Sequence, residues 1–175
     1  MTNILYGEKV VLLPLSLSDT DLIVKWRNLS CVRNYFVFRD NLTKEMHEDW
    51  IQKMIDTGKV KQFIIQDAKS QKKVGSIYLR DIDYQFHSAE LGVFIGEEDY
   101  RGKGFGSESI KMIVDYGFKC LNLHRIFLRV FESNKSAILC YKNAGFEIEG
   151  IARDMVYVDN QFHNMVFMSA INKSE

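Results

Sequence analysis

The chain has 175 residues, a length that fits one domain, and 46% of them are hydrophobic, which is enough to bury a sizeable core. Its 23 basic and 23 acidic residues give a net charge of zero. This balance removes the usual electrostatic reason to expect nucleic acid or an anionic membrane as a partner, so we expect neither.

Cysteine and histidine spacing gives no sign of a disulfide framework or a metal site. Cys31, Cys120 and Cys140 are an odd number, widely spaced and without a C-x-x-C pair. His124 and His163 are isolated and show no ligand spacing. The N-terminus lacks the long apolar segment of a signal peptide, and no stretch approaches the ~18 apolar residues of a membrane span. We therefore expect a cytoplasmic protein with no bound metal.

The first third of the chain predicts one strand followed by helices. Segment 8–15 (EKVVLLPL) is typical of a strand, and Ser18 with Asp21 resembles a capping box that opens a helix. Thr43 could cap a second full helix, in which apolar residues recur at four-residue spacing. The expected helical segments are one that ends near Asn28, a short turn at 30–35 and a longer helix that ends at Gly58.

The remaining two thirds alternate between strand and helix patterns. The expected elements are strands 61–67, 73–82 and 88–96, a glycine-rich turn, a helix after it, strand 125–131, helix 134–144, and strands 146–158 and 161–171 around a hairpin turn. The order βααβββαβαββ predicts an α/β (α+β) fold, with a mixed sheet and helices on both faces. Because no linker or repeat divides the sequence, we expect one domain over residues 1–175.

The glycine-rich turn is the run Arg101, Gly102, Lys103, Gly104, Phe105 and Gly106, between a predicted strand and a predicted helix. Unpaired N–H groups of the first helical turn and the helix dipole attract an anion there, and glycines let the backbone approach it closely. A dinucleotide fingerprint would need glycine at Ser107, and a P-loop would need Ser or Thr at Gly104. Both are excluded, but a plain surface turn is still possible from this motif alone.

Two blocks together resemble a known family. Arg101, Gly104 and Gly106 match R/Q-x-x-G-x-G/A, motif A of the GNAT superfamily of N-acetyltransferases. A second block downstream resembles the family's N-x-x-A-x-x-x-Y-x-x-x-G-F pattern through Asn134, Ala137, Tyr141, Gly145 and Phe146. The order of the two blocks and of the predicted elements matches the family's fold from about residue 8 to 171.

The resemblance implies an acyltransferase that uses acetyl-CoA. Its fold implies a V-shaped cofactor cleft between the fourth and fifth strands, 88–96 and 125–131. The pyrophosphate would lie on Arg101–Gly106, Asn134 would contact the cofactor, and the pantetheine arm would pair with the backbone around Val93, Phe94 and Ile95. A backbone N–H of that strand would polarise the thioester carbonyl.

Acetyl transfer to an amine needs a base for the ammonium and an acid for the departing thiolate. Tyr141 occupies the family position whose phenol is usually assigned as the acid, although a packed aromatic would fit the same position. Glu90 is the candidate base, with His87, Glu132 and a chain of water molecules as alternatives. Asn134 could equally be the N-cap of its helix.

The acceptor side is predicted from the N-terminal third. Its pattern resembles two branches of the family, the amino-sugar acetyltransferases of pseudaminic acid biosynthesis and the ribosomal-protein and spermidine acetyltransferases. For a nucleotide-linked amino sugar, Arg27, Arg33 and His47 could contact the phosphates, although both arginines could instead form helix-end ion pairs.

Three functions follow from these patterns. The main hypothesis is transfer of the acetyl group in a ternary complex to a primary amine, with a nucleotide-linked amino sugar as the acceptor. The alternative acceptor is a ribosomal-protein N-terminus or a polyamine. A hypothesis from another class is a non-catalytic domain that senses acyl-CoA. The final hairpin or an exposed strand edge could also form a homodimer.

Overall fold

The computed structural model describes residues 4–173. Its strands are β1 (Leu5–Tyr6), β2 (Val10–Pro14), β3 (Lys61–Asp67), β4 (Lys73–Asp83), β5 (Ser88–Ile95), β6 (Arg125–Phe131), β7 (Glu147–Val158) and β8 (Gln161–Ile171). Its helices are α1 (Thr20–Asn28), α2 (Ser30–Arg33), α3 (Lys44–Trp50), α4 (Phe105–Cys120) and α5 (Lys135–Asn143). Short helical segments lie at η1 (Leu17–Asp19), η2 (Ile51–Ile55) and η3 (Glu98–Tyr100).

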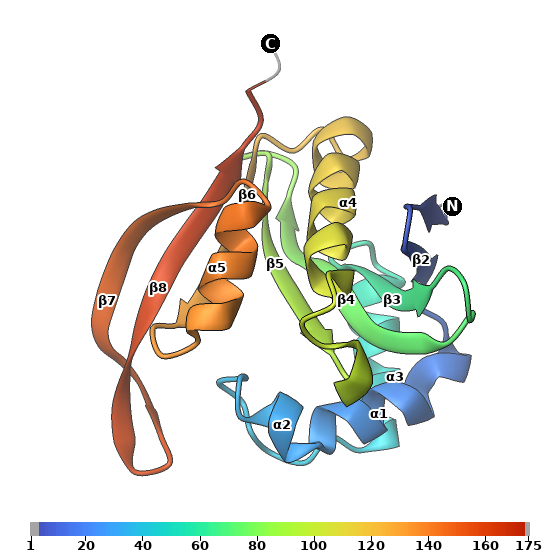
Figure 1. Cartoon of the computed structure of the whole chain (residues 1–175), viewed down its shortest axis with the longest axis horizontal. Coiled ribbons are helices and arrows are strands. Elements are labelled where there is room, and N and C mark those ends of the chain that lie inside the picture. Colours follow the sequence, from blue (N-terminus) through green and yellow to red (C-terminus); the bar gives the residue numbers. More distant parts are fainter. Residues whose placement is uncertain (1–3, 174–175) are drawn as a thin grey trace.

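The strands form one eight-stranded sheet in the order β1-β2-β3-β4-β5-β6-β8-β7 (Figure 1). Neighbouring strands are antiparallel except β5 and β6, which are parallel and joined through α4. The mixed sheet and the helix order confirm the predicted fold class. All predicted strands are present within two residues at each end, and only the two-residue β1 was not expected.

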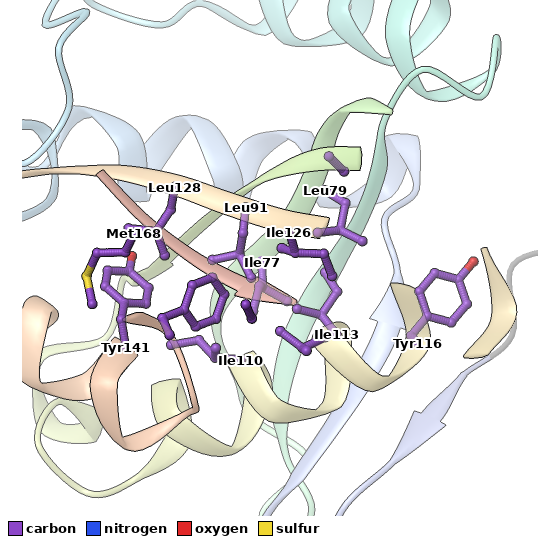
Figure 2. Packing of buried hydrophobic residues seen from close by; sticks show 14 of the residues in the cluster. Ile77, Leu79, Leu91, Ile110, Ile113, Tyr116, Ile126, Leu128, Tyr141 and Met168 are labelled. Atoms are coloured by element: carbon purple, nitrogen blue, oxygen red, sulfur yellow. The ribbon is translucent and has the colours of Figure 1, made fainter. Parts of the chain in front are cut away.

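Helices cover both faces of the sheet, because the alternation of side chains along each strand fills two cores. In β3, Phe63 and Ile65 face the core under α4, whereas Ile64 faces the core under α1 and η2. In Figure 1, α4 and α5 lie in front of the sheet and α3 lies behind β3 and β4. Figure 2 shows the larger core, in which Ile110 and Ile113 of α4 pack on strand residues.

Two helix starts show how tertiary contacts choose among similar sequence patterns. Thr43 caps α3 as predicted, since its hydroxyl accepts a hydrogen bond from the N–H of Met46 at 3.3 Å. The predicted box of Ser18 and Asp21 is wrong: the carboxylate of Asp19 accepts the N–H of Ser16 at 3.0 Å and also pairs with Lys73. The long predicted helix to Gly58 is divided, with α3 passing into the π-helical turn η2.

Within residues 4–173, no helix has both the length and the apolar character needed to cross a membrane. In the same range, no group of three or more Asp, Glu, His or Cys side chains lies close enough to hold a metal ion. Cys31, Cys120 and Cys140 are all free thiols.

Candidate active site

The centre of the molecule is the opening between β5 and β6. Their parallel pairing is limited to three residue pairs, of which the last joins Glu90 to Phe127. Beyond that point β5 continues along β4 and β6 continues along β8, so the two strands diverge toward their carboxyl ends (Figure 1). The V-shaped separation predicted between these strands is therefore present. Each strand leads into a helix, α4 or α5, whose N-terminus lies at this end of the sheet.

The glycine turn forms the N-terminus of α4. Gly102 and Gly104 have φ angles of +69° and +91°, a region that favours glycine, and Gly104 is the N-cap. The first N–H that bonds within the helix is that of Glu108, which donates to the carbonyl of Gly104 at 3.0 Å. The N–H groups that precede it in the first turn remain available for an anion. A Cβ built on Gly106 would meet nothing within 4 Å, so there is room for a ligand against this backbone.

The side chain of Arg101 folds back onto the end of β5 and stabilises the start of the glycine turn. Its Nε donates to the carbonyl of Ile95 at 3.0 Å, and its Nη2 lies 3.4 Å from the carbonyl of Gly96 and 3.2 Å from Cys31 Sγ. The guanidinium therefore ties the end of β5 to α2. Lys103 is exposed, so its ammonium could meet a phosphate in front of the turn.

Alternate residues of β5 direct their backbone N–H and C=O groups toward the opening. The N–H of Gly96 donates to the carbonyl of Val74, next to β4 in the sheet. Every second residue before Gly96, including Phe94, therefore directs its backbone N–H and C=O groups toward β4. Val93 and Ile95 therefore direct theirs toward the opening, although the carbonyl of Ile95 already accepts from Arg101. The Phe94 side chain packs edge-on to Trp26 and Phe36 in the smaller core. Among the three predicted pantetheine contacts, Val93 thus has the freest backbone.

Asn134 and Tyr141 lie on the other side of the opening. Asn134 is the N-cap of α5, where its Oδ1 accepts the N–H of Ala137 at 3.2 Å. Its amide nitrogen makes no hydrogen bond with other residues of the described range. The Tyr141 ring is 8% exposed and lies in the larger core with Leu128 and Met168 (Figure 2). Burial raises the pKa of the Tyr141 phenol.

The carboxylate of Glu90 forms ion pairs with two arginines, Arg80 and Arg129. Its Oε2 accepts from Arg80 Nη2 at 2.8 Å, and its Oε1 accepts from Arg129 Nε at 2.9 Å. The residue is only 5% exposed, so these guanidinium groups supply the partners that a buried carboxylate requires. Oε2 accepts three guanidinium N–H groups and Oε1 accepts one, so Oε1 is the oxygen with capacity left for a proton.

Arg27 and Tyr78 form a second polar group, which interacts with Glu90 through Tyr78. The Arg27 guanidinium carbon lies 3.4 Å from the centre of the Phe36 ring, and its buried Nη1 has no hydrogen-bond partner in the part of the chain described. Burial lowers the pKa of Arg27 and raises that of Tyr78, and each side chain interacts electrostatically with the other. Tyr78 also interacts electrostatically with Tyr141, so the two phenols lie near each other.

Tyr78 was missed by the sequence reasoning. A Cβ added to Gly92 would meet the Tyr78 ring at 2.3 Å, so the ring can lie this close to β5 only because residue 92 is glycine. A glycine inside a predicted strand is the sequence signal for such a close approach. Nothing in the sequence identifies which side chain fills the space.

The other two predicted acceptor contacts lie within the helical layer. Arg33 donates from Nη1 to Asn41 at 2.8 Å. His47 is 3% exposed and its Nδ1 lies 3.0 Å from the hydroxyl of Thr20, between α1 and α3. Burial lowers the pKa of His47. The structure therefore brings together Arg27, Tyr78, Tyr141 and Glu90, but it does not bring Arg33 or His47 to them.

Comparison with known proteins identifies this arrangement. The model of the acetyltransferase (GNAT) domain matches residues 14–167, which is most of the chain. The chain belongs to the GNAT acetyltransferase family. It is thus an acyltransferase, and acetyl-CoA is its acetyl donor.

Two relatives and one solved enzyme show the range of similar proteins. An uncharacterised N-acetyltransferase, p20 of Bacillus licheniformis, is 30% identical over 86% of this chain and 85% of its own. Spermidine N(1)-acetyltransferase of Escherichia coli K12 is 28% identical over 93% of this chain and 86% of its own. Spermidine N-acetyltransferase of Vibrio cholerae, solved with CoA and spermine, superposes with a TM-score of 0.88 at 26% identity, covering 94% of this chain and 96% of the other. The Vibrio cholerae enzyme has also been solved as a dodecamer.

The known donor provides a test of the site. CoA carries a pyrophosphate, and the turn supplies free N–H groups, two glycines in left-handed conformation and open space at Gly106. The diverging strands leave backbone groups of β5 without a strand partner beyond Glu90, as an extended pantetheine arm requires. The residues present therefore fit this cofactor.

Proposed function

We propose that this GNAT acetyltransferase moves the acetyl group to a primary amine of a polyamine, by direct attack in a ternary complex. The opening between β5 and β6, with the glycine turn at one side and Tyr141 at the other, supports the transfer. The polyamine acceptor is supported by the spermidine acetyltransferases among the relatives, which align over nearly the whole chain. They favour this alternative over the amino sugar that the sequence first suggested.

Each side chain has a separate task in this proposal. Acetyl-CoA supplies an activated acetyl group, held through the N–H groups of the glycine turn and the backbone of Val93. Asn134 donates its amide N–H to the cofactor. Tyr141 gives its proton to the departing sulfur, since a phenol is protonated at neutral pH and can act as a general acid. Glu90, through its Oε1, or water held near it, takes the proton of the amine.

A thiol-release assay with acetyl-CoA tests the transfer. The panel contains spermidine, a UDP-linked 4-amino sugar and a peptide with a free N-terminus. We expect CoA release with spermidine and little with the other two. Preference for the amino sugar or the peptide would contradict the polyamine proposal. Binding of acetyl-CoA without release of CoA for any amine would instead indicate the non-catalytic sensor.

The charge of Arg27 separates the acceptor classes. A polyamine is cationic, so a neighbouring guanidinium repels it, whereas the unpaired Nη1 would bind an oxygen of an anionic acceptor. For the proposed polyamine, Arg27→Met should leave the KM for spermidine unchanged or lower it. A rise in KM for the preferred acceptor would show that the acceptor brings an oxygen to Arg27. Arg33→Met, a change on the neighbouring α2, is the matched control.

We also propose that the chain assembles with copies of itself. The final hairpin carries exposed apolar side chains on β7 and β8, such as Ile151, Tyr157 and Phe162. A related enzyme forms a dodecamer, which agrees with such an assembly. The strand β7 is also an edge of the sheet, with backbone groups that no further strand pairs in residues 4–173.

A further inference from the structure

The phenol of Tyr78 lies across a strand that borders the opening, in the place of a missing side chain. Tyr78 of β4 is directly opposite Gly92 of β5 in the antiparallel register. A Cβ built on Gly92 would lie 2.3 Å from Cζ and 2.4 Å from the hydroxyl oxygen of Tyr78. The end of the side chain that carries the oxygen therefore covers the backbone of β5. The transfer steps above give this hydroxyl no task.

The alternation of side chains along β5 places this hydroxyl beside the proposed site of attack. Leu91 faces the larger core, so Glu90 and Gly92 face the opposite side of the sheet. Tyr78 fills the room above Gly92 and interacts electrostatically with Glu90. Val93 follows Gly92 and directs its backbone N–H toward the opening, where the proposed cofactor position puts the thioester carbonyl. An amine that approaches this carbonyl from the side of Glu90 therefore passes the phenol of Tyr78.

The phenol oxygen of Tyr78 is available to a ligand. It forms no hydrogen bond with another residue between 4 and 173. The fully buried polar side-chain atoms of this range that lack a partner belong to Arg27, His47 and His163, so the unpaired oxygen of Tyr78 is accessible. A phenol is protonated at neutral pH and has two acceptor lone pairs and one donor hydrogen. The hydroxyl can therefore accept a hydrogen bond without changing its charge.

The charge around Tyr78 favours an acceptor nitrogen that has already lost its proton. Arg27 and Arg80 both interact electrostatically with Tyr78. Glu90 and Asp81 pair with Arg80, whereas Arg27 forms no ion pair with any residue of the described range. Because like charges disfavour the charged form, an ammonium beside Tyr78 loses its proton more readily than it does in water. The nitrogen is then neutral, and the uncharged phenol oxygen matches it.

We propose that Tyr78 binds the nitrogen that receives the acetyl group. The amine donates one N–H to the phenol oxygen, which directs the nitrogen lone pair at the thioester carbon. The nitrogen then bonds to the acetyl carbon, the carbon–sulfur bond breaks and the sulfur takes the proton of Tyr141. The surplus proton of the nitrogen goes to Glu90 or to water, so Tyr78 neither gains nor loses a proton. This inference rests on the proposed transfer to an amine and not on the polyamine as the acceptor.

The substitution Tyr78→Phe tests the assignment, because it removes the oxygen and keeps the ring against Gly92. With the acceptor that the thiol-release panel selects, kcat/KM should fall roughly 10- to 100-fold, the range for a donor left without its partner. The KM for acetyl-CoA and the midpoint of urea unfolding should stay at the wild-type values, since the oxygen bonds no protein group. Tyr116→Phe, at a buried tyrosine of α4, is the matched control and should keep the wild-type kcat/KM.

Two results would overturn the inference. One is full turnover of Tyr78→Phe together with a loss in Tyr78→Leu, which would show that the ring only supports β5. The other is a loss in Tyr78→Phe that appears equally in the affinity for acetyl-CoA or in the unfolding midpoint, which would indicate a general disturbance of the site. A chain that prefers the amino sugar or the peptide, and loses this turnover in Tyr78→Phe, would contradict only the polyamine and would support the role of Tyr78.

Discussion

The hydroxyl of Tyr141 lies at the edge of an apolar cluster, where it has no hydrogen-bond partner within residues 4–173. We expect Tyr141→Phe to lower kcat by roughly 10²-fold or more, the range for loss of a general acid. The affinity for acetyl-CoA should change little, because the ring and its packing remain. Steady-state kinetics with calorimetry of CoA binding measures both quantities.

Tyr116 provides a matched control for this substitution. It is also a buried tyrosine, 9% exposed, in the same cluster, and burial raises the pKa of its phenol as well. Figure 2 shows it at the end of the cluster away from Tyr141. Tyr116→Phe should leave kcat nearly unchanged. Equal turnover of the Tyr141 variant and the wild-type enzyme would remove Tyr141 from the mechanism.

His47 should make the stability of the chain depend on pH. Burial lowers its pKa below the ordinary value of 6.5, and only the nearby charge of Asp19 acts in the opposite direction. The folded state therefore holds the neutral imidazole, whereas the unfolded state gains a proton once the pH falls below about 6.5. The free energy of unfolding should thus fall as the pH decreases from 7.5 through 6.5 to 5.5.

Urea unfolding at these three pH values checks the prediction about His47. The variant His47→Gln should be less stable at pH 7.5 but should lose less stability on acidification than the wild-type chain. His124→Gln changes an exposed histidine and should keep the wild-type slope. The same slope in the His47 variant and in the wild-type chain would show that other groups cause the pH dependence.

At the scale of elements, the start of α4 separates backbone strain from contact with the ligand. Gly104 has a φ of +91°, so Gly104→Ala should lower the free energy of unfolding by about 1–2 kcal/mol. Gly106 lies in the helix, and its added Cβ would meet no protein atom within 4 Å. Gly106→Ala should leave stability intact and weaken CoA binding by roughly 1–3 kcal/mol, because the methyl group would crowd the pyrophosphate.

Thermal unfolding and calorimetry of CoA binding distinguish the two glycine variants. Gly150→Ala, in β7, gives a control in which the added Cβ also meets nothing within 4 Å, at a site far from the turn in sequence. It should bind CoA as the wild-type chain does. Unchanged CoA affinity in the Gly106 variant would show that the pyrophosphate does not approach this part of the helix.

The elements could be predicted from the sequence because their signals are local. The strand 125–131 alternates Ile126, Leu128 and Val130 toward the core, and the observed strand has the same bounds. The start of the first helix could not be predicted in this way. Two S-x-x-D patterns overlap there, and the one used is the one whose acid, Asp19, also pairs with Lys73 at 2.5 Å. A partner 54 residues away leaves no local signal.

In the candidate site too, features set by local sequence could be predicted, whereas features set by distant contacts could not. The glycine turn and the N-cap Asn134 depend on backbone conformation close to them in sequence, and both are found where they were predicted. The partners of the long polar side chains depend on which strands become neighbours. Glu90 meets Arg129 only because β5 pairs with β6, and Arg101 folds back on β5. Their roles could be stated only as hypotheses.

At the scale of the molecule, the opening between β5 and β6 is framed by segments far apart in sequence. Arg39, which follows α2, pairs with Asp159 at the turn between β7 and β8. Its guanidinium also lies 5.7 Å from the centre of the Phe131 ring, at the end of β6. The helical layer and the final hairpin are thereby linked across the end of the sheet where the strands diverge. An assembly that fixes the hairpin would also restrain the acceptor side.

The final hairpin should therefore mediate self-association. The rings of Tyr157 and Phe162 lie 4.8 Å apart on neighbouring strands, yet their side chains are 59% and 65% exposed. A pair of exposed aromatic rings on an arm that includes an edge strand is typical of an interface. In sedimentation velocity, we expect a species heavier than the 20.4 kDa monomer, and Tyr157→Lys with Phe162→Lys should shift it toward the monomer.

The control for this experiment is another exposed aromatic residue. Tyr84, in the turn between β4 and β5, is 55% exposed, and Tyr84→Lys should leave the sedimentation of the chain unchanged. If assembly also orders the acceptor side through Arg39, the monomeric double variant should show a raised KM for the amine while the affinity for acetyl-CoA is retained. A wild-type chain that sediments as a monomer at micromolar concentration would contradict self-association. An oligomer that persists in the double variant would place the interface on another surface.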